Sequence, residues 1–210
     1  ATGAGKSTII NLISRLYDFD SGDIVIDGIS IRDYDLKTLR NRVSVVLQEV
    51  FLFADSLYNN ITLYNPQITQ DMVIKASKEI GVHKFIESLP QGYNYNVKER
   101  GVMLSSGQRQ LIAFLRAYIT QPAILVLDEA TSSVDSYSEE IIQRAIDKLT
   151  HGKTSIIIAH RLTTVKNADR ILVMDKGKIV EEGTHEELLK VKGGNYSKLY
   201  EVQFAEEVPI

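Results

Sequence analysis

The 210-residue sequence lacks cysteine, an excess of positive charge and any long apolar run. Without cysteine, disulfide bonds are excluded, and a reducing compartment suits the chain. The net charge of −3 provides no overall basic field of the kind that attracts nucleic acid. No apolar stretch approaches the length of a membrane span, and the sequence shows neither a signal peptide nor an internal repeat. What remains has the composition of a globular protein, with 44% hydrophobic and 24% charged residues.

A glycine-rich turn stands at the front of the sequence, in the run Thr2-Gly3-Ala4-Gly5-Lys6-Ser7-Thr8, called the phosphate loop below. It matches all but the leading glycine of the phosphate-binding pattern G-x-x-x-x-G-K-[ST]. Glycines let backbone N–H groups approach an anion closely, and Lys6 adds a mobile positive charge for the outer phosphates. Ser7 offers a hydroxyl to Mg²⁺, and Thr8 can hydrogen-bond a phosphate oxygen. An ordinary glycine turn before a helix is the alternative.

The residues after this turn predict a helix that starts at the anion. Ile9, Leu12, Ile13 and Leu16 recur at helical spacing and form one expected apolar stripe. The N–H groups and the dipole at the start of a helix favour a bound anion. The sequence therefore predicts a phosphate site where this helix begins.

Strands alternate with helices along much of the chain, which predicts a mostly parallel sheet with helices on its faces. Asp27-Gly28 and Asp175-Lys176-Gly177 predict antiparallel hairpins. Strand patterns vanish between residues 51 and 120, where helical segments are expected instead. We therefore expect an α/β fold with its core at residues 1–50 and 121–210, an inserted helical subdomain at 51–120 and a small antiparallel part. Strands are expected at 43–47, 124–127, 154–159 and 170–174, and helices at 36–42, 71–80, 84–88, 106–119, 137–149 and 196–204.

Polar side chains follow three of the expected strands, at the edge where open α/β sheets bind ligands. Asp128 can hold Mg²⁺, and Glu129 can take a proton from an attacking water. Gln48 also ends a buried strand, and its amide can contact Mg²⁺ and the water. His160 can hydrogen-bond a terminal phosphate from a strand that parallels the one ending in Glu129. The alternatives are two acids that start a loop, a polar strand end at Gln48 and a structural histidine.

The run Leu104-Ser105-Ser106-Gly107-Gln108, called the signature turn below, precedes an expected helix. Ser105 and Gln108 fit the S-x-x-Q capping box, so these residues can simply start that helix. A serine hydroxyl and the N–H groups at a helix start also form an anion site. Because Lys6 already serves one phosphate site, a nucleotide held by a second molecule is the natural ligand for this one.

In this order along the chain, these motifs resemble the ATP-binding cassette of ABC transporters. The resemblance covers essentially the whole chain, and it implies a P-loop NTPase fold of the RecA-like type. Three further stretches resemble the exporter branch, and bacterial lipid and drug exporters are the most similar group. The motifs are Gly3–Thr8, Gln48, Leu104–Gln108, Ile124–Glu129, Ser133-Val134-Asp135 and His160, and the exporter-like stretches are Glu99-Arg100-Gly101, Ala159–Leu162 and Lys178–His185.

The resemblance implies roles for the matching residues. Thr2, Gly3, Ala4, Gly5, Lys6, Ser7 and Thr8 would hold ATP, with Lys6 on its β- and γ-phosphates. Ser7, Gln48 and Asp128 would approach Mg²⁺, Glu129 would be the general base, and His160 would be the switch histidine. Ser105, Ser106, Gly107 and Gln108 would bind the γ-phosphate of ATP held by a second cassette, and Asp135 would lie in a loop that communicates across that dimer. Glu99 would lie in the segment that touches the membrane domains, and Phe51–Phe53 would either line their docking groove or be covered by the helical subdomain.

The sequence departs from the family pattern at three places. Ser106 replaces the middle glycine of the signature turn, which tightens the fit but keeps the backbone N–H. Lys98 stands where glycine is common. The base-stacking aromatic and the strand that feeds the phosphate loop are absent, so we expect a fragment of a longer polypeptide whose membrane-spanning part precedes it. One lost stacking contact would weaken ATP binding by about 1–3 kcal/mol.

The sequence therefore predicts an ATPase domain that powers export at the cytoplasmic face of the cell membrane. Its expected partners are a second nucleotide-binding domain, in a homodimer or heterodimer, and the transmembrane domains, with no nucleic acid. One alternative is a soluble ABC-type ATPase of DNA repair or translation, which would need coiled-coil arms or paired cassettes. Another is the hydrolysis-poor half of a heterodimer, which the intact Glu129 and His160 disfavour. A P-loop kinase would not need Leu104–Gln108.

Overall fold

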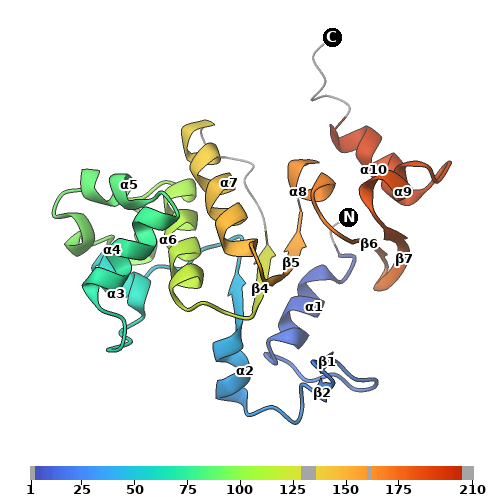
Figure 1. The fold of residues 1–210 in the computed structure, drawn as a ribbon, viewed down its shortest axis with the longest axis horizontal. Coiled ribbons are helices and arrows are strands. Elements are labelled where there is room, and N and C mark those ends of the chain that lie inside the picture. Colours follow the sequence, from blue (N-terminus) through green and yellow to red (C-terminus); the bar gives the residue numbers. More distant parts are fainter. Residues whose placement is uncertain (1–2, 129–135, 160–161, 205–210) are drawn as a thin grey trace. The chain divides into compact units, whose positions relative to one another are not determined.

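The computed structural model describes residues 3–128, 136–159 and 162–204, and it combines α-helices with short β-strands (Figure 1). The expected α/β class is therefore confirmed. The helices are α1 (Lys6–Ile13), α2 (Leu36–Arg42), α3 (Leu57–Thr62), α4 (Gln70–Glu79), α5 (His83–Ser88), α6 (Ser106–Ile119), α7 (Ser136–Thr150), α8 (Leu162–Lys166), α9 (His185–Leu189) and α10 (Asn195–Phe204). The strands are β1 (Val25–Ile26), β2 (Ile29–Ser30), β3 (Val43–Val46), β4 (Ile124–Asp128), β5 (Thr154–Ile158), β6 (Ile171–Asp175) and β7 (Lys178–Gly183), with short 3₁₀ turns η1 (Gly92–Asn94) and η2 (Glu99–Gly101).

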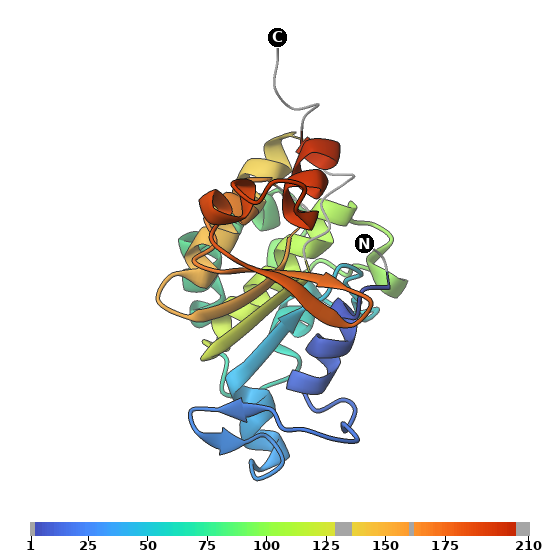
Figure 2. The same ribbon diagram turned by 90° about the vertical axis from the view of Figure 1, so that its right-hand side faces the viewer.

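The central sheet has the strand order β3-β4-β5 (Figure 2). β3 and β4 run parallel, with Val43 opposite Ile124 and Val46 opposite Leu127. The residues 125–127 of β4 are buried although their side chains point alternately to the two faces. This is the pattern of a strand that is covered on both sides, as the unbroken apolar run predicts. The carboxyl ends of β3 and β4 consequently lie at one edge of the sheet.

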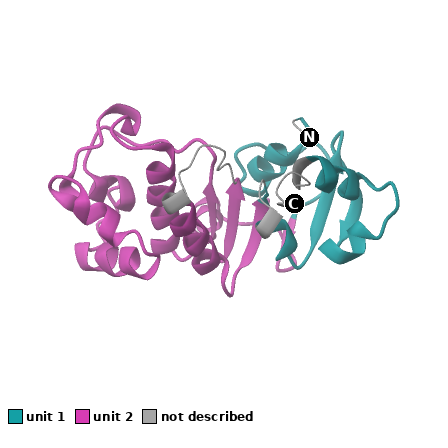
Figure 3. Ribbon diagram, turned by 90° about the horizontal axis from the view of Figure 1, so that it is seen from above, with its two compact units in different colours: residues 1–24, 158–210 teal, residues 25–157 magenta. Residues whose placement is uncertain are grey.

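The chain forms two compact units, residues 1–24 with 158–210 and residues 25–157 (Figure 3). The larger unit contains α2 to α7 and a continuous apolar core. α6 supplies much of that core, because Leu111, Ile112, Phe114 and Leu115 are all buried. α6 packs against α3, α4 and α7. The division into a core at 1–50 and 121–210 with an insertion at 51–120 stays a prediction.

The two predicted hairpins are present. β1 and β2 pair in antiparallel fashion around Asp27-Gly28, and β6 pairs with β7 around Lys176-Gly177. The smaller unit has a compact apolar cluster in which Val173 of β6, Leu188 of α9 and Tyr196 of α10 are buried. This small antiparallel part therefore forms as the sequence predicts.

The expected apolar stripe on α1 is wrong in two respects. The residue that α1 buries most deeply is Ile10, which is 3% exposed and was not in the stripe. Leu16 lies beyond the end of the helix and is 58% exposed. The helix stops early because Ser14 closes it, its hydroxyl donating to the Ile10 carbonyl oxygen, and Arg15 then takes a left-handed conformation.

Candidate functional site

The phosphate loop is described from Gly3 onward, while Thr2 lies outside the described residues. Gly5 stands at the N-cap of α1 with φ 97° and ψ 4°, a left-handed conformation that residues with a Cβ adopt at a cost. The Gly177 N–H donates to the Ala4 carbonyl oxygen at 3.1 Å. A Cβ built on Gly5 would lie 3.5 Å from the Gly177 Cα. The β6–β7 turn therefore supports this loop from behind.

The start of α1 suits an anion. Gly5 offers no side chain to cap the helix, and the first turn contains no acidic residue. The side chains of Ser7 and Thr8 are exposed, and Lys6 is half-buried. A helix that begins in this way presents its dipole and its first-turn N–H groups to a ligand. The geometry fits the predicted role of Gly3, Ala4, Gly5, Lys6, Ser7 and Thr8 as a phosphate cradle.

Gln48 and Asp128 both lie at the edge of the central sheet where β3 and β4 end. Val46 pairs with Leu127, so Gln48 and Asp128 follow paired positions at the carboxyl ends of adjacent parallel strands. Asp128 is half-buried and Gln48 is exposed. Carboxylate and amide oxygens are hard donors that suit Mg²⁺. The predicted residues Glu129, Asp135 and His160 lie outside the described residues, as does the segment Ser133-Val134.

The signature turn closes the N-terminus of α6 with its own side chains. The Ser105 hydroxyl accepts a hydrogen bond from the Gln108 N–H at 3.2 Å, and the Ser105 N–H donates to Gln108 Oε1 at 2.9 Å. This is the complete capping box that the sequence predicts. Ser105 and Ser106 are exposed, whereas Gly107 is buried. The capping interpretation is confirmed, and the anion-binding interpretation stays a prediction.

The segment before the signature turn packs on the segment after Gln48. Gly101 has φ 68°, and a Cβ built on it would lie only 2.8 Å from Leu52 Cδ1. On either side of the buried Leu52, Phe51 and Phe53 are 56% and 47% exposed, and their rings meet edge to face with centroids 5.2 Å apart. Exposed Val102 follows Gly101 directly. An apolar surface therefore surrounds the Leu52–Gly101 contact.

Sequence reasoning missed the partners of Arg116, a residue near the end of α6. Its guanidinium donates to the carbonyl oxygens of Asn60 and Phe51 and to Asn60 Oδ1. Burial lowers the pKa of this guanidinium to about 10, so it still carries its charge at neutral pH. Asn60 and Phe51 lie 56 and 65 positions before Arg116, so no local sequence pattern predicts these contacts.

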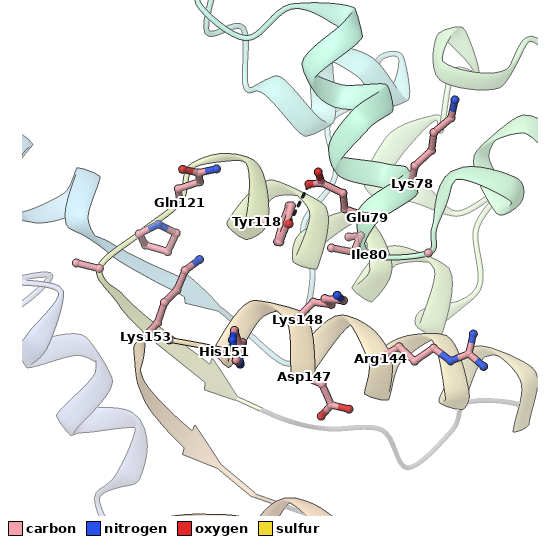
Figure 4. A pocket seen from close by; sticks show the side chains of 14 residues that line it. Lys78, Glu79, Ile80, Tyr118, Gln121, Arg144, Asp147, Lys148, His151 and Lys153 are labelled. Carbon is pink, nitrogen blue, oxygen red and sulfur yellow. Dashed lines mark hydrogen bonds between the residues drawn. The ribbon is translucent and has the colours of Figure 1, made fainter.

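A groove with a volume of about 1070 Å³ lies elsewhere in the larger unit (Figure 4). It includes Ala123 and Lys153, which precede β4 and β5, and it therefore lies at the amino end of these strands, away from Asp128. Inside it, the Tyr118 hydroxyl donates to Glu79 Oε2 at 2.9 Å. The pKa of Tyr118 is raised mainly by burial and further by its hydrogen bond to Glu79. Burial lowers the pKa of Lys153. No predicted site residue lines the groove.

A phosphate loop that opens a helix and a carboxylate that ends a buried parallel strand together define P-loop nucleotide-binding proteins. The family model described as "ABC transporter" matches residues 1–132 of this sequence. The chain belongs to the ABC transporter family. This confirms the resemblance drawn from the motifs.

Individual relatives agree with the family. The chain is 49% identical over 204 residues to "Uncharacterized ABC transporter ATP-binding protein YknV" of Bacillus subtilis (strain 168), covering 97% of this chain and 34% of that protein. It is 49% identical over 205 residues to "ATP-dependent lipid A-core flippase" of Shewanella oneidensis, again covering 97% of this chain and 34% of the relative. The solved "Structure of a bacterial Atm1-family ABC exporter with ATP bound" superposes with a TM-score of 0.89 at 38% identity, covering 100% of this chain and 36% of that chain.

The chain spans about a third of the length of the curated relatives it matches. The relatives named here include ATP-binding, flippase and exporter proteins. Within the described ranges, no helix combines the length and the apolar character needed to cross a bilayer.

Proposed function

We propose that this chain hydrolyses ATP and powers transmembrane export as the nucleotide-binding domain of an ABC exporter. The observation that carries the proposal is the shared sheet edge, where Asp128 ends β4, Gln48 follows the end of the parallel strand β3, and Glu129 is the next residue in sequence after Asp128. The likeness to an ATP-bound exporter over the full length of the chain supports the same function. Because ATP is a cytoplasmic fuel, the domain would stand at the cytoplasmic face of the cell membrane.

The proposed reaction assigns each residue one task. The backbone N–H groups of the phosphate loop and Lys6 hold the phosphates in place. Glu129 takes a proton from water, whose oxygen bonds to the γ-phosphorus while the bond to the ADP oxygen breaks. His160 hydrogen-bonds the terminal phosphate. The oxygen donors Ser7, Gln48 and Asp128 would hold Mg²⁺, which neutralises charge on the phosphates when bound.

Two cassettes would meet head to tail in this mechanism. The signature turn of one chain would approach the γ-phosphate bound by the phosphate loop of the other. Exposure of Ser105 and Ser106 at the start of α6 supports this role, because a second chain can reach them. Closure would exclude water and complete the charge around the γ-phosphate. Asp135 would lie in the loop that communicates across this dimer.

The membrane domains would dock on the apolar surface around the Leu52–Gly101 contact. Phe51, Phe53, Val102 and Met103 are exposed there, and exposed aromatic and aliphatic side chains that cluster mark interaction sites. Glu99 is exposed two residues before Gly101 and would add a charged contact. Phe51 and Phe53 follow Gln48 within five positions in the chain, so docking and catalysis would involve one segment.

The test uses the full-length polypeptide that contains this sequence, reconstituted in lipid vesicles with Mg²⁺ and ATP. Glu129→Gln removes the proposed base, and we expect turnover to fall by about 10²–10⁴-fold with ATP binding largely intact. Glu140→Gln is the matched control, because Glu140 is an exposed carboxylate paired with Arg144 on α7. Release of inorganic phosphate measures turnover.

Unchanged turnover in Glu129→Gln would remove Glu129 from the mechanism. No phosphate release from the parent protein, under any lipid composition that keeps it folded, would contradict the ATPase proposal itself. Phosphate transfer to a small acceptor instead of water would indicate a kinase.

A further inference from the structure

Arg116 contacts two separate parts of the larger unit through three hydrogen bonds. Nη1 donates to the Phe51 carbonyl oxygen at 2.9 Å, Nε to the Asn60 carbonyl oxygen at 2.5 Å, and Nη2 to Asn60 Oδ1 at 3.0 Å. The three acceptors are fixed oxygens that match the planar fork of a guanidinium. Arg116 therefore joins α6 to α3 and to the segment after Gln48.

Asn60 completes the arrangement from the other side. It is 0% exposed, and its side chain bonds the segment again, because Oδ1 accepts from the Phe53 N–H at 2.8 Å and Nδ2 donates to the Phe53 carbonyl oxygen at 3.0 Å. Nδ2 also donates to the Ser56 carbonyl oxygen at 3.0 Å. The buried Asn60 amide thus makes four hydrogen bonds. Losing them would leave buried polar atoms unsatisfied, which destabilises the fold.

These contacts are together called the Arg116–Asn60 clamp. The clamp holds residues 51–53 at one end through the Phe51 carbonyl oxygen and at the other through the backbone of Phe53. Arg116 lies ten positions after Ser106 on an uninterrupted helix, a span of about 15 Å. Gln48 lies three positions before Phe51. A continuous helix is stiff over this length, so movement of the signature turn would move the segment that follows Gln48.

We propose that Arg116 and Asn60 are positioning residues that fix the spacing between Gln48 and the signature turn during ATP hydrolysis. This inference rests on the proposed ATPase function, because in the head-to-tail dimer Gln48 would serve the ATP of its own chain and the signature turn would serve the ATP of the partner chain. The side-chain contacts that define the clamp are all made with other protein groups. Its effect on catalysis passes through the segment it holds.

The test variant is Arg116→Lys in the full-length polypeptide, reconstituted in lipid vesicles. Lysine keeps the charge but is a single ammonium on a flexible stem, and it cannot bond three oxygens in one plane. Arg144→Lys is the matched control, because Arg144 makes one exposed ion pair with Glu140. Two measurements are made on each variant: amide hydrogen exchange by mass spectrometry and the kinetics of phosphate release.

We expect the exchange of the peptide covering residues 50–56 to quicken by about tenfold or more in Arg116→Lys, because the Phe53 N–H loses a held acceptor. Peptides of α4 and α5 should exchange as in the parent. We expect kcat to fall by about tenfold while KM for ATP stays within about twofold, the split produced when only the transition-state arrangement is lost. Arg144→Lys should match the parent in both measurements.

A second variant covers the possibility that Arg116→Lys does not fold. Asn60→Asp keeps an oxygen for Arg116 but replaces the donor that holds the carbonyl oxygens of Phe53 and Ser56. It should quicken exchange in the same peptide and lower kcat in the same way.

Unchanged exchange at residues 50–56 would overturn the clamp, and quickened exchange with an unchanged kcat would show it to be structural only. A parent protein that releases no phosphate would instead contradict the proposed ATPase function. The two failures are therefore distinct.

Discussion

The two helices that begin at predicted phosphate sites differ in how their first turns are closed. α1 follows Gly5, which has no side chain and a left-handed backbone. α6 follows Ser105, which exchanges two hydrogen bonds with Gln108. The start of α6 is thus capped by its own side chains, whereas no side chain of Gly5 caps α1.

Under the proposed function, this difference predicts an order of binding. A helix start without a capping side chain is completed by an anion, so the phosphate loop is suited to take ATP first. A capped start is stable without a ligand, so the signature turn can stay exposed until a second chain arrives. The predictions below separate these two roles.

Among the variants that separate these two roles, Lys6→Met is expected to have the largest effect. The loss of a charge-assisted contact to phosphate costs about 1.5–3 kcal/mol, which weakens ATP binding by about 10–10²-fold. Equilibrium binding of Mg²⁺-ATP to the full-length protein measures this. Lys75→Met, an exposed lysine of α4, should bind ATP as the parent does. Equal ATP affinities of the parent, Lys6→Met and Lys75→Met would show that Lys6 at the start of α1 does not contribute to ATP binding.

Ser105→Ala should act on turnover and not on ATP affinity. Loss of the cap costs about 1 kcal/mol of stability, and loss of the hydroxyl should lower turnover by about tenfold. The matched control is Thr184→Ala, because Thr184 and Glu187 form the same capping box at α9. If both variants lose equal stability and neither loses turnover, the signature turn is a cap alone.

Gly101→Ala tests how firmly the entry to α6 is held. A Cβ at φ 68° costs about 1–2 kcal/mol, and here it also meets Leu52 Cδ1 at 2.8 Å. Gly152→Ala has the same backbone strain, with φ 69° and no atom within 4 Å of the added carbon. The difference between their urea unfolding midpoints isolates the crowding at Gly101, where the added carbon also lies 3.2 Å from Arg109 Cδ. Identical midpoints would show that Leu52 and Arg109 move aside without cost.

The smallest effect concerns the pH dependence of the caps at α6 and α9. Hydrogen bonds from the Thr184 N–H, and then from its hydroxyl, lower the pKa of Glu187 below its ordinary 4.5. A carboxyl whose folded pKa is lowered stabilises the fold above its unfolded pKa and loses this contribution as pH falls through the folded pKa. Gln108 has no such titration. The Thr184 amide should therefore lose exchange protection below pH 4.5 while the Ser105 amide keeps it; parallel loss at both would contradict this.

Local signals predicted some parts of the molecule well. The S-x-x-Q pattern and the apolar spacing after it gave α6 its observed bounds, 106–119, and Asp27-Gly28 gave the β1–β2 turn. Both depend on residues within a few positions of one another. α3 was missed because Leu57–Thr62 is short, and Ser56 as its cap resembles any loop serine.

Tertiary packing decided what the sequence could not. The face of α1 that is buried centres on Ile10, because the packing around a helix and not its own periodicity alone selects the stripe. The Arg116–Asn60 contact joins residues 56 positions apart, and neither residue type predicts the other. The Gln48–Asp128 edge was predictable because parallel strands share an end.

The hydrogen bond from Gly177 to Ala4 has a consequence for synthesis. The ribosome makes the cradle among the first residues of this sequence, but the turn that backs it comes some 170 residues later. At a translation rate of about 5–20 residues per second, the β6–β7 turn is synthesised roughly 10–30 s after the phosphate loop. Nucleotide capture during translation should thus begin only after the β6–β7 turn leaves the exit tunnel.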